Sequence, residues 1–249
     1  MCIRDSLIIN LEAPMLSYGS TAVDNIRPSE DFPGRALITG LLANALGWTR
    51  QEHQKTQRLQ ERISHAARNE ATGPGGNQPL HDFHTASLGR YDTAWSTTGI
   101  PETRAGSEQT YNSPVLRRTE YRADLRTLAA LTLDNPAEHP TLEELAQALQ
   151  YPARTLFIGR KTCLPSGMIY AAIKEAETAT EALSLLPSRS GLDHDPVQWD
   201  GDSHHESVTK TGELWVNDLR DWRNGVHTGQ RLVNTGLQRP SNPQPGEPA

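Results

Sequence analysis

The amino-acid sequence predicts an α+β fold, a β-sheet with helices on one face, and three observations support this class. An apolar stripe at three- and four-residue spacing begins after Pro33 and stops at Gly47, which is typical of an amphipathic helix. Residues 118–133 alternate apolar with charged side chains and then become continuously apolar, as a strand does when it enters a core. A second helical stripe follows Thr141 and Glu144, which have the spacing of a capping box.

The first expected element is a short buried strand at residues 7–11, which Pro14 ends. Residues 1–6 are charged and unrelated to this strand, so we expect them to lie outside the native sequence, and the apolar stretch after them is too short for a signal peptide. After the helix that Gly47 ends, a second capping box opens a polar helix. Because Leu59 and Ile63 are its few apolar residues, we expect this helix to be largely exposed.

Residues 72–79 consist mainly of Gly, Pro, Asn and Gln, and the residues from there to Pro114 show no strong periodicity of apolar side chains. A stretch of this length without a pattern is usually functional, a protruding hairpin or disordered. We interpret residues 73–114 as an inserted arm.

The chain continues with predicted strands at 155–158 and 168–173 and a short helix at 178–186. The order strand, helix, strand, excursion, strand, helix, strand is that of a ferredoxin-like unit, as in RNA-recognition modules, whose open sheet face binds single-stranded RNA. We therefore expect a ferredoxin-like domain at residues 7–173, a smaller β-rich region at 174–234 and a disordered, proline-rich tail at 235–249.

The net charge of −6 argues against an indiscriminate nucleic-acid binder. Residues 188–206, which we expect to be a loop, hold five acidic residues and one basic residue, so most of the net charge is local. The 24 basic residues comprise 20 Arg and only 4 Lys, and Arg suits bidentate contacts with phosphates and base edges. No run of apolar residues approaches the length of a membrane span. The two cysteines are too few for a disulfide framework, which indicates the cytoplasm.

Catalytic and metal-binding patterns are weak. His81, Asp82 and His84 lack the spacing of two ligands on one helical face, and no third cluster accompanies them, so we predict no metal and no cofactor. Cys163 follows two cations but has no evident His partner, and the sequence contains neither a nucleophile elbow nor a phosphate loop.

Arginine carries the stronger signal. Arg35 lies in the first turn of the predicted helix, where free backbone amides favour an anion, so it marks a phosphate site or is simply solvated. Arg117 and Arg118 flank the base of the arm. Arg122 and Arg126 share a strand face with Glu120 and Asp124, and these cations either contact RNA or are neutralised by cross-strand pairs.

Two further segments are candidates for contact with RNA. Arg160 and Lys161 follow the flexible Gly159 at an expected strand end, which favours close approach to a sugar-phosphate chain. Tyr18, beside Gly19, either stacks on a base or fills the core.

Several of these segments together resemble the CasD family of type I-E CRISPR Cascade complexes. The resemblance covers residues 7–173, with scattered support beyond, for instance at 219–222. The segments that carry it are 13–19, Arg27 with Pro28, 32–35 and the helix up to Gly47, 82–85, and 157–163. Gly34 departs from the family, which more often has a side chain there.

The resemblance implies a repeat-associated RNA-binding fold whose thumb is the arm at 73–114. It also implies binding of the 5′ handle of CRISPR RNA and contacts with the backbone and large subunits, with target DNA reached only indirectly. The candidate RNA-binding residues are Tyr18, Arg27, Arg35, His84, Arg117, Arg118, Arg122, Arg160 and Lys161.

The leading functional prediction is a non-catalytic RNA-binding subunit, because a few selectively placed arginines on an acidic chain suit one component of a ribonucleoprotein. The alternative is a metal-independent endoribonuclease that uses His84, Tyr91 and an Arg, since such cleavage requires a general base and a cation. A protein-only adaptor is the third possibility.

Overall fold

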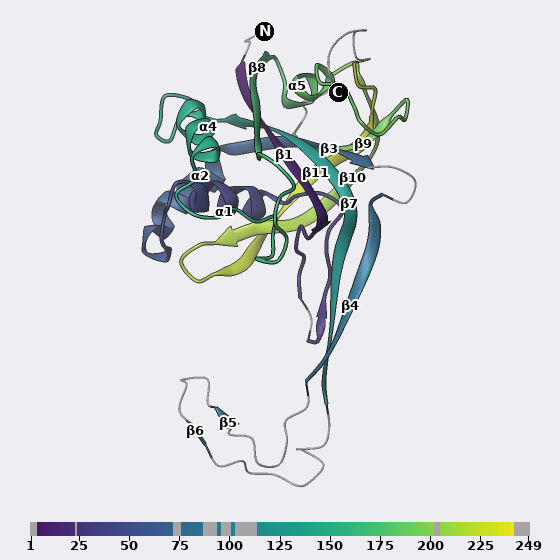
Figure 1. Ribbon diagram of the computed structural model, residues 1–249. Coiled ribbons are helices and arrows are strands. Elements are labelled where there is room, and N and C mark those ends of the chain that lie inside the picture. Colours follow the sequence, from purple (N-terminus) through teal and green to yellow (C-terminus); the bar gives the residue numbers. More distant parts are fainter. Residues whose placement is uncertain are drawn as a thin grey trace.

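The computed structural model describes residues 4–22, 24–71, 76–86, 94–95, 101–102, 114–201 and 205–241. It contains one nine-stranded sheet and few helices, which confirms the α+β class (Figure 1). The sheet strands are β1 (Arg4–Leu16), β2 (Ile26–Arg27), β3 (Ile63–Ala71), β4 (Gln78–Ala86), β7 (Val115–Leu133), β8 (Tyr170–Ala176), β9 (Asp195–Asp200), β10 (Val208–Asp221) and β11 (Val226–Gln238). The helices are α1 (Arg35–Ala45), the 3-10 turn η1 (Arg50–Glu52), α2 (His53–Arg62), α4 (Leu142–Gln150) and α5 (Ala179–Ser184).

The strands lie in the order β10-β11-β9-β3-β7-β1-β8, and β2 and β4 pair with the outer part of β7. Every pair is antiparallel except β2 with β7. A separate pair, β5 (Ala94–Trp95) with β6 (Pro101–Glu102), lies within the arm. The described residues hold no helix long and apolar enough to cross a membrane.

Two hydrophobic clusters lie on opposite faces of the sheet, because alternate residues of a strand point to opposite sides. Leu7, Ile9 and Leu11 of β1 join the first cluster, which α1, α2 and α4 cover. Ile8 joins the second cluster, which contains Leu183 of α5. The helices of the expected domain at residues 7–173 thus share one face, while α5, which follows that domain, covers the other, since the central strands are apolar on both sides.

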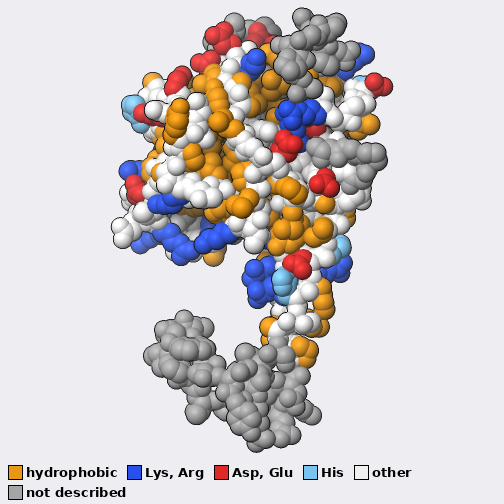
Figure 2. All heavy atoms as spheres, in the orientation of Figure 1, with side chains coloured by type: hydrophobic (Ala, Val, Ile, Leu, Met, Phe, Trp, Pro, Cys, Tyr) orange, Lys and Arg blue, Asp and Glu red, His pale blue; other side chains and the backbone are white. Residues whose placement is uncertain are grey.

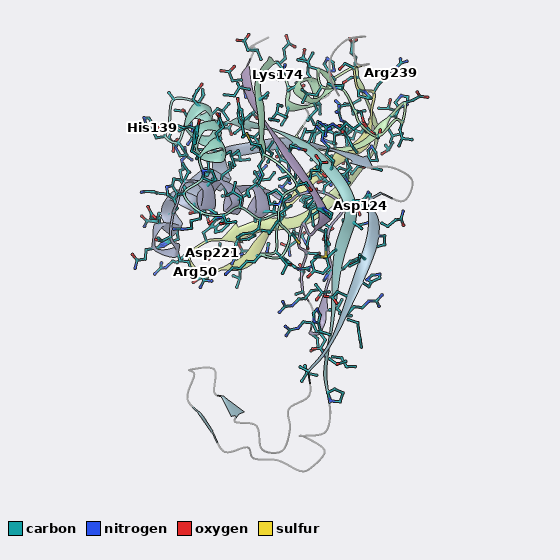
Figure 3. All side chains as sticks on the ribbon, in the orientation of Figure 1. Arg50, Asp124, His139, Lys174, Asp221 and Arg239 are labelled. Carbon is teal, nitrogen blue, oxygen red and sulfur yellow. The ribbon has the colours of Figure 1, made fainter. Side chains whose placement is uncertain are left out.

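The strands that lead to the arm leave the rest of the sheet, which we call the body, at Asp124 of β7 (Figure 3). Before this residue β7 pairs with β4, up to Ala123, and after it with β3, from Leu125 onward. Asp124 has a φ of 46°, in the left-handed region that Asp tolerates better than most residues. We call the outer part of β7 with β2 and β4 the stem; it projects from the body in Figure 1.

The predicted helices agree with the structure: the helices expected after Pro33 and Thr141 are α1 and α4, and the short C-terminal helix is α5. Both predicted capping boxes are present. The polar helix ends one residue earlier than its apolar pattern suggests, because Ile63 begins β3.

Other predicted elements differ from the structure. Residues 155–158 do not form a strand: the N–H of Ile158 donates to the carbonyl of Cys163 at 2.8 Å, which closes a turn. The expected acidic loop contains β9, with Asp195 and Trp199 buried between β3 and β11. Residues 235–238 belong to β11 and are not tail, while 242–249 lie outside the described residues. Residues 4–6, which looked unrelated to the first strand, extend β1 and pair with β8.

Candidate nucleic-acid interface

The stem brings four of the predicted site residues together. Arg27 lies on β2, His84 on β4, and Arg117 and Arg118 on β7. In the register, Arg117 is opposite His84, while Arg118 is opposite both Phe83 of β4 and Ile26 of β2. These pairs fix which side chains share a face of the stem.

Three arginines of the stem, Arg27, Arg117 and Arg118, are exposed, and no carboxylate among the described residues pairs with them. By contrast, Arg58 is held by Glu138 at 2.7 Å and Arg231 by Asp218 at 2.7 Å. Figure 2 shows blue and pale blue side chains gathered on the stem, beside hydrophobic ones. This surface presents cations that are available to an external anion.

His84 contacts the carboxylate of Asp82 two residues earlier, and both side chains are substantially exposed. A His–Asp contact orients an imidazole, so this pair has one element of a general-base arrangement. Tyr91, the other expected member of such a site, lies outside the described residues. No group of three or more metal-ligating side chains occurs in the part of the chain that the structure describes.

Arg160 fastens the stem to the body. Its guanidinium donates to the backbone carbonyls of Glu120, Arg27 and Pro28 and lies 4.7 Å from the centre of the Tyr121 ring. This differs from the predicted direct RNA contact, because the donors of Arg160 are used within the protein. Lys161, the next residue, is exposed.

Gly159 permits this arrangement. Its φ is +81°, and a Cβ added there would lie 1.7 Å from the carbonyl oxygen of Ser17. Glycine is therefore required for the close approach of the two loops, in place of the expected approach of a sugar-phosphate chain.

The expected phosphate site at Arg35 is occupied by the protein itself. The carboxylate of Asp218 accepts a hydrogen bond from the backbone N–H of Arg35 at 2.7 Å, and the Arg35 guanidinium donates to Asp200 at 2.7 Å. In place of an external anion or of solvent, β10 and β9 supply both anions that Arg35 contacts in this structure.

These carboxylates belong to a half-buried ionic network that Arg231 and His65 complete. Burial raises the pKa of Asp218, an effect that the Arg35 backbone N–H and guanidinium partly oppose. Burial and the neighbouring cations Arg231 and Arg35 lower the pKa of His65 well below its usual value. His65 is therefore neutral, and its Nε2–H donates to the carbonyl of Pro33 at 3.1 Å.

Tyr18 and Arg122 also have internal roles. The Tyr18 side chain is 4% exposed and its hydroxyl lies 2.5 Å from Oγ1 of Thr127, so it fills the core and offers no stacking surface. Burial raises the pKa of Tyr18 above its usual value. Arg122 pairs with Asp31, and Arg126 with the buried Glu70 opposite it on β3. Of the two alternatives for this face, the structure thus shows neutralisation by ion pairs, with partners other than Glu120 and Asp124.

Sequence reasoning missed Phe83, whose side chain is 62% exposed on the stem. The available signal was an aromatic residue within the motif at 82–85, on a segment without a core-facing period. It also missed Asp218, for which the uncapped Gly34 before α1 was an indirect signal.

Comparisons with known proteins agree with the resemblance found in the sequence. The chain is 28% identical over 213 residues to the CRISPR system Cascade subunit CasD of Escherichia coli (strain K12), covering 83% of this chain and 84% of that protein. Its fold is similar to a chain in a CRISPR RNA-guided surveillance complex, with a TM-score of 0.66, 18% identity and coverage of 94% and 90% of the two chains. It is also similar to a crystal structure described as a Cas protein, with a TM-score of 0.58, 20% identity and coverage of 96% and 100%.

The model of the family described as CRISPR-associated protein (Cas_Cas5) matches residues 6–234, which is most of the chain. This chain therefore belongs to the Cas5 family of CRISPR-associated proteins.

Proposed function

We propose that this chain is a non-catalytic RNA-binding subunit of a type I-E CRISPR surveillance complex and holds the 5′ handle of CRISPR RNA. The relative of known identity is a Cascade subunit, and the similar fold occurs in an RNA-guided complex. The proposed partners are CRISPR RNA and the backbone and large subunits of the complex. Target DNA is reached only through these partners, and the place of action is the cytoplasm.

The observation that carries this proposal is the group of exposed arginines on the stem, Arg27, Arg117 and Arg118, which have no carboxylate partner among the described residues. Phosphates attract such cations, and affinity grows with each phosphate that a cation neutralises. The net charge of −6 does not oppose this, because a local basic surface is sufficient.

The sheet supports a ferredoxin-like body as the finer description of the fold. The four strands β3, β7, β1 and β8 are neighbours in this order, and each pair is antiparallel. Helices α1 and α2 connect β1 to β3, and α4 lies between β7 and β8. This is the strand order expected for a βαββαβ unit.

The face that RNA-recognition modules leave open is covered here. Helix α5 packs on it, and Arg68, Glu70 and Arg126 form buried ion pairs beside it. Since buried and paired arginines are not available to phosphates, we place the RNA on the stem and not on the sheet face.

The test is binding of the full chain to single-stranded 5′-handle RNA at several salt concentrations. Arg117→Ala and Arg118→Ala are each expected to weaken binding and to reduce the salt slope by about 0.7. Arg50→Ala is the matched control, because Arg50 is exposed and labelled far from the stem in Figure 3. Unchanged affinity in both stem variants would exclude the stem as the RNA-binding surface.

The contact between His84 and Asp82 favours the endoribonuclease as a second candidate. Incubation of the chain with repeat RNA in EDTA, followed by analysis for a 2′,3′-cyclic phosphate, separates the two functions. Intact RNA is the expected result. Cleavage at a single site that His84→Ala abolishes would replace the non-catalytic proposal, and absence of any RNA binding would favour the protein-only adaptor.

A further inference from the structure

We infer that Ile26, Arg118 and Phe83 form a platform on which one unpaired RNA base stacks. This inference rests on the proposed function and deepens it, because it assigns base contact to a surface where the arginines alone explain only phosphate contact. We call these three residues the stacking row.

The register of the stem defines the stacking row. Arg118 of β7 is opposite Ile26 of β2 on one side and opposite Phe83 of β4 on the other. Directly opposite residues point to the same face, and neighbouring strands lie roughly 4.8 Å apart. The three side chains therefore form a continuous row across the three strands.

The two apolar members of this row are exposed, with 62% of Phe83 and 56% of Ile26 open to solvent. Apolar side chains that are exposed next to one another, unlike single ones, are characteristic of surfaces that bind a partner. Leu116, two residues before Arg118 on the same face of β7, is 42% exposed and extends the apolar surface.

Arg118 at the centre of the row favours RNA over an apolar protein partner. No carboxylate among the described residues pairs with it, so a purely apolar partner would bury an unpaired guanidinium at a large cost. Single-stranded RNA avoids this cost, because a base presents a π-face to Phe83 and Arg118 while the adjacent phosphate neutralises the cation.

The opposite face of the stem also carries basic residues. Arg117 and His84 are opposite each other there, and Arg27 is opposite Thr119 on β7. The stem thus presents cations on one face and an aromatic ring with a guanidinium on the other. Electropositive grooves with aromatic platforms are the usual arrangement of proteins that bind single strands.

The test compares Phe83 variants of the full chain by fluorescence anisotropy with single-stranded 5′-handle RNA. Phe83→Ala is expected to weaken binding by about 5- to 150-fold, the range for loss of one base–aromatic stack. Phe83→Trp is expected to keep the affinity, whereas Phe83→Leu, which keeps apolar character but lacks a π-face, is expected to resemble Phe83→Ala. Because Phe83 is exposed, thermal unfolding of all three variants is expected to match the wild type.

A scan of abasic nucleotides identifies the stacked base. At one position the abasic substitution is expected to weaken binding to the wild type and to leave binding to Phe83→Ala unchanged, which is the signature of a direct pair in a double-mutant cycle. The salt slope of Phe83→Ala is expected to equal that of the wild type, since no phosphate contact is lost.

Several outcomes would overturn the inference. If Phe83→Ala bound the handle RNA normally while Arg117→Ala bound it weakly, stacking would be excluded and the proposed function would stand. If Phe83→Ala lost a protein subunit from the purified complex at unchanged RNA affinity, the row would be a protein contact. If the wild-type chain and its complex bound no RNA, the proposed function would fail with the inference.

Discussion

The carboxylate of Asp218 caps helix α1 by accepting a hydrogen bond from the backbone N–H of Arg35 at 2.7 Å, across 183 positions of sequence. The same carboxylate accepts from Arg231 of β11 at 2.7 Å. A Cβ at position 34 would lie 2.8 Å from Cβ of Asp218, so the glycine before α1 makes room for this cap. The hairpin of β10 and β11 thus serves as the N-terminal cap of the first helix.

Replacing Asp218 by Ala is expected to destabilise the fold by about 3 kcal/mol, because the change removes the helix cap and leaves Arg231 partly buried without one of its two carboxylate partners. Chemical denaturation measures this loss. Asp193→Ala is the matched control, since Asp193 is an exposed acidic residue of the loop before β9. Equal stability of the two variants would show that the cap contributes nothing.

His65 gives the protein a predictable response to acid. Its pKa is lowered in the folded state, so below about pH 6.5 the unfolded chain binds a proton that the folded protein does not. The contribution of His65 to the free energy of unfolding is therefore expected to fall by about 1.4 kcal/mol for each pH unit below 6.5. Above that pH this contribution is fully present.

Chemical denaturation of the wild type and of His65→Gln at pH 7.5 and 5.5 measures the contribution of His65. Gln cannot titrate, so the free energy of unfolding of the variant is expected to fall by about 1 kcal/mol less than that of the wild type between these two pH values. An identical pH dependence in both proteins would contradict the burial of a neutral His65.

Local signals predicted much of this fold. The capping boxes at Thr49 and Thr141 and the apolar stripe of α1 involve residues within a few positions of each other, so periodicity and side-chain chemistry identify them. Arg117 and Arg118 of the stem were predicted because they flank the base of the arm, and Arg27 and His84 because they lie in segments that carry the family resemblance.

Non-local contacts explain the failures. The acid that fills the expected phosphate site, Asp218, comes from a distant hairpin, and β9 is a strand only because β3 and β11 supply its partners on both sides. Polarity alone made residues 188–206 resemble a loop. At the helix N-terminus and in the acidic stretch, tertiary pairing determined an outcome that the local pattern does not indicate.

Gly159→Ala is expected to disrupt the junction between the body and the stem. The new methyl group would meet the Ser17 carbonyl, and the left-handed φ adds strain of about 1–2 kcal/mol. Gly19→Ala is the matched control, because Gly19 has a φ of +73° but nothing within 4 Å of an added Cβ. Thermal unfolding is expected to show a much larger loss for Gly159→Ala, and similar losses would mean that only the backbone angle matters.

Tyr18→Phe separates a core role from a role in RNA binding. Loss of the hydroxyl removes the hydrogen bond to Thr127 and is expected to cost about 1–2 kcal/mol of stability. RNA affinity at a temperature where both proteins are folded is expected to be unchanged, because the ring is buried. A reduced affinity for handle RNA without loss of stability would restore Tyr18 as a contact residue.

Arg160→Lys tests whether Arg160 positions the stem or contacts RNA by charge. Lysine keeps the positive charge but cannot donate to the three carbonyls of Glu120, Arg27 and Pro28 in one planar arrangement. If Arg160 acts by positioning, Arg160→Lys and Arg160→Ala are expected to weaken handle binding to a similar extent. Both are also expected to increase hydrogen exchange at β2, which the bond from the Arg118 N–H to the Asn25 carbonyl joins to β7 at 2.9 Å. Wild-type affinity and protection in the lysine variant would instead assign Arg160 to the RNA as a charge.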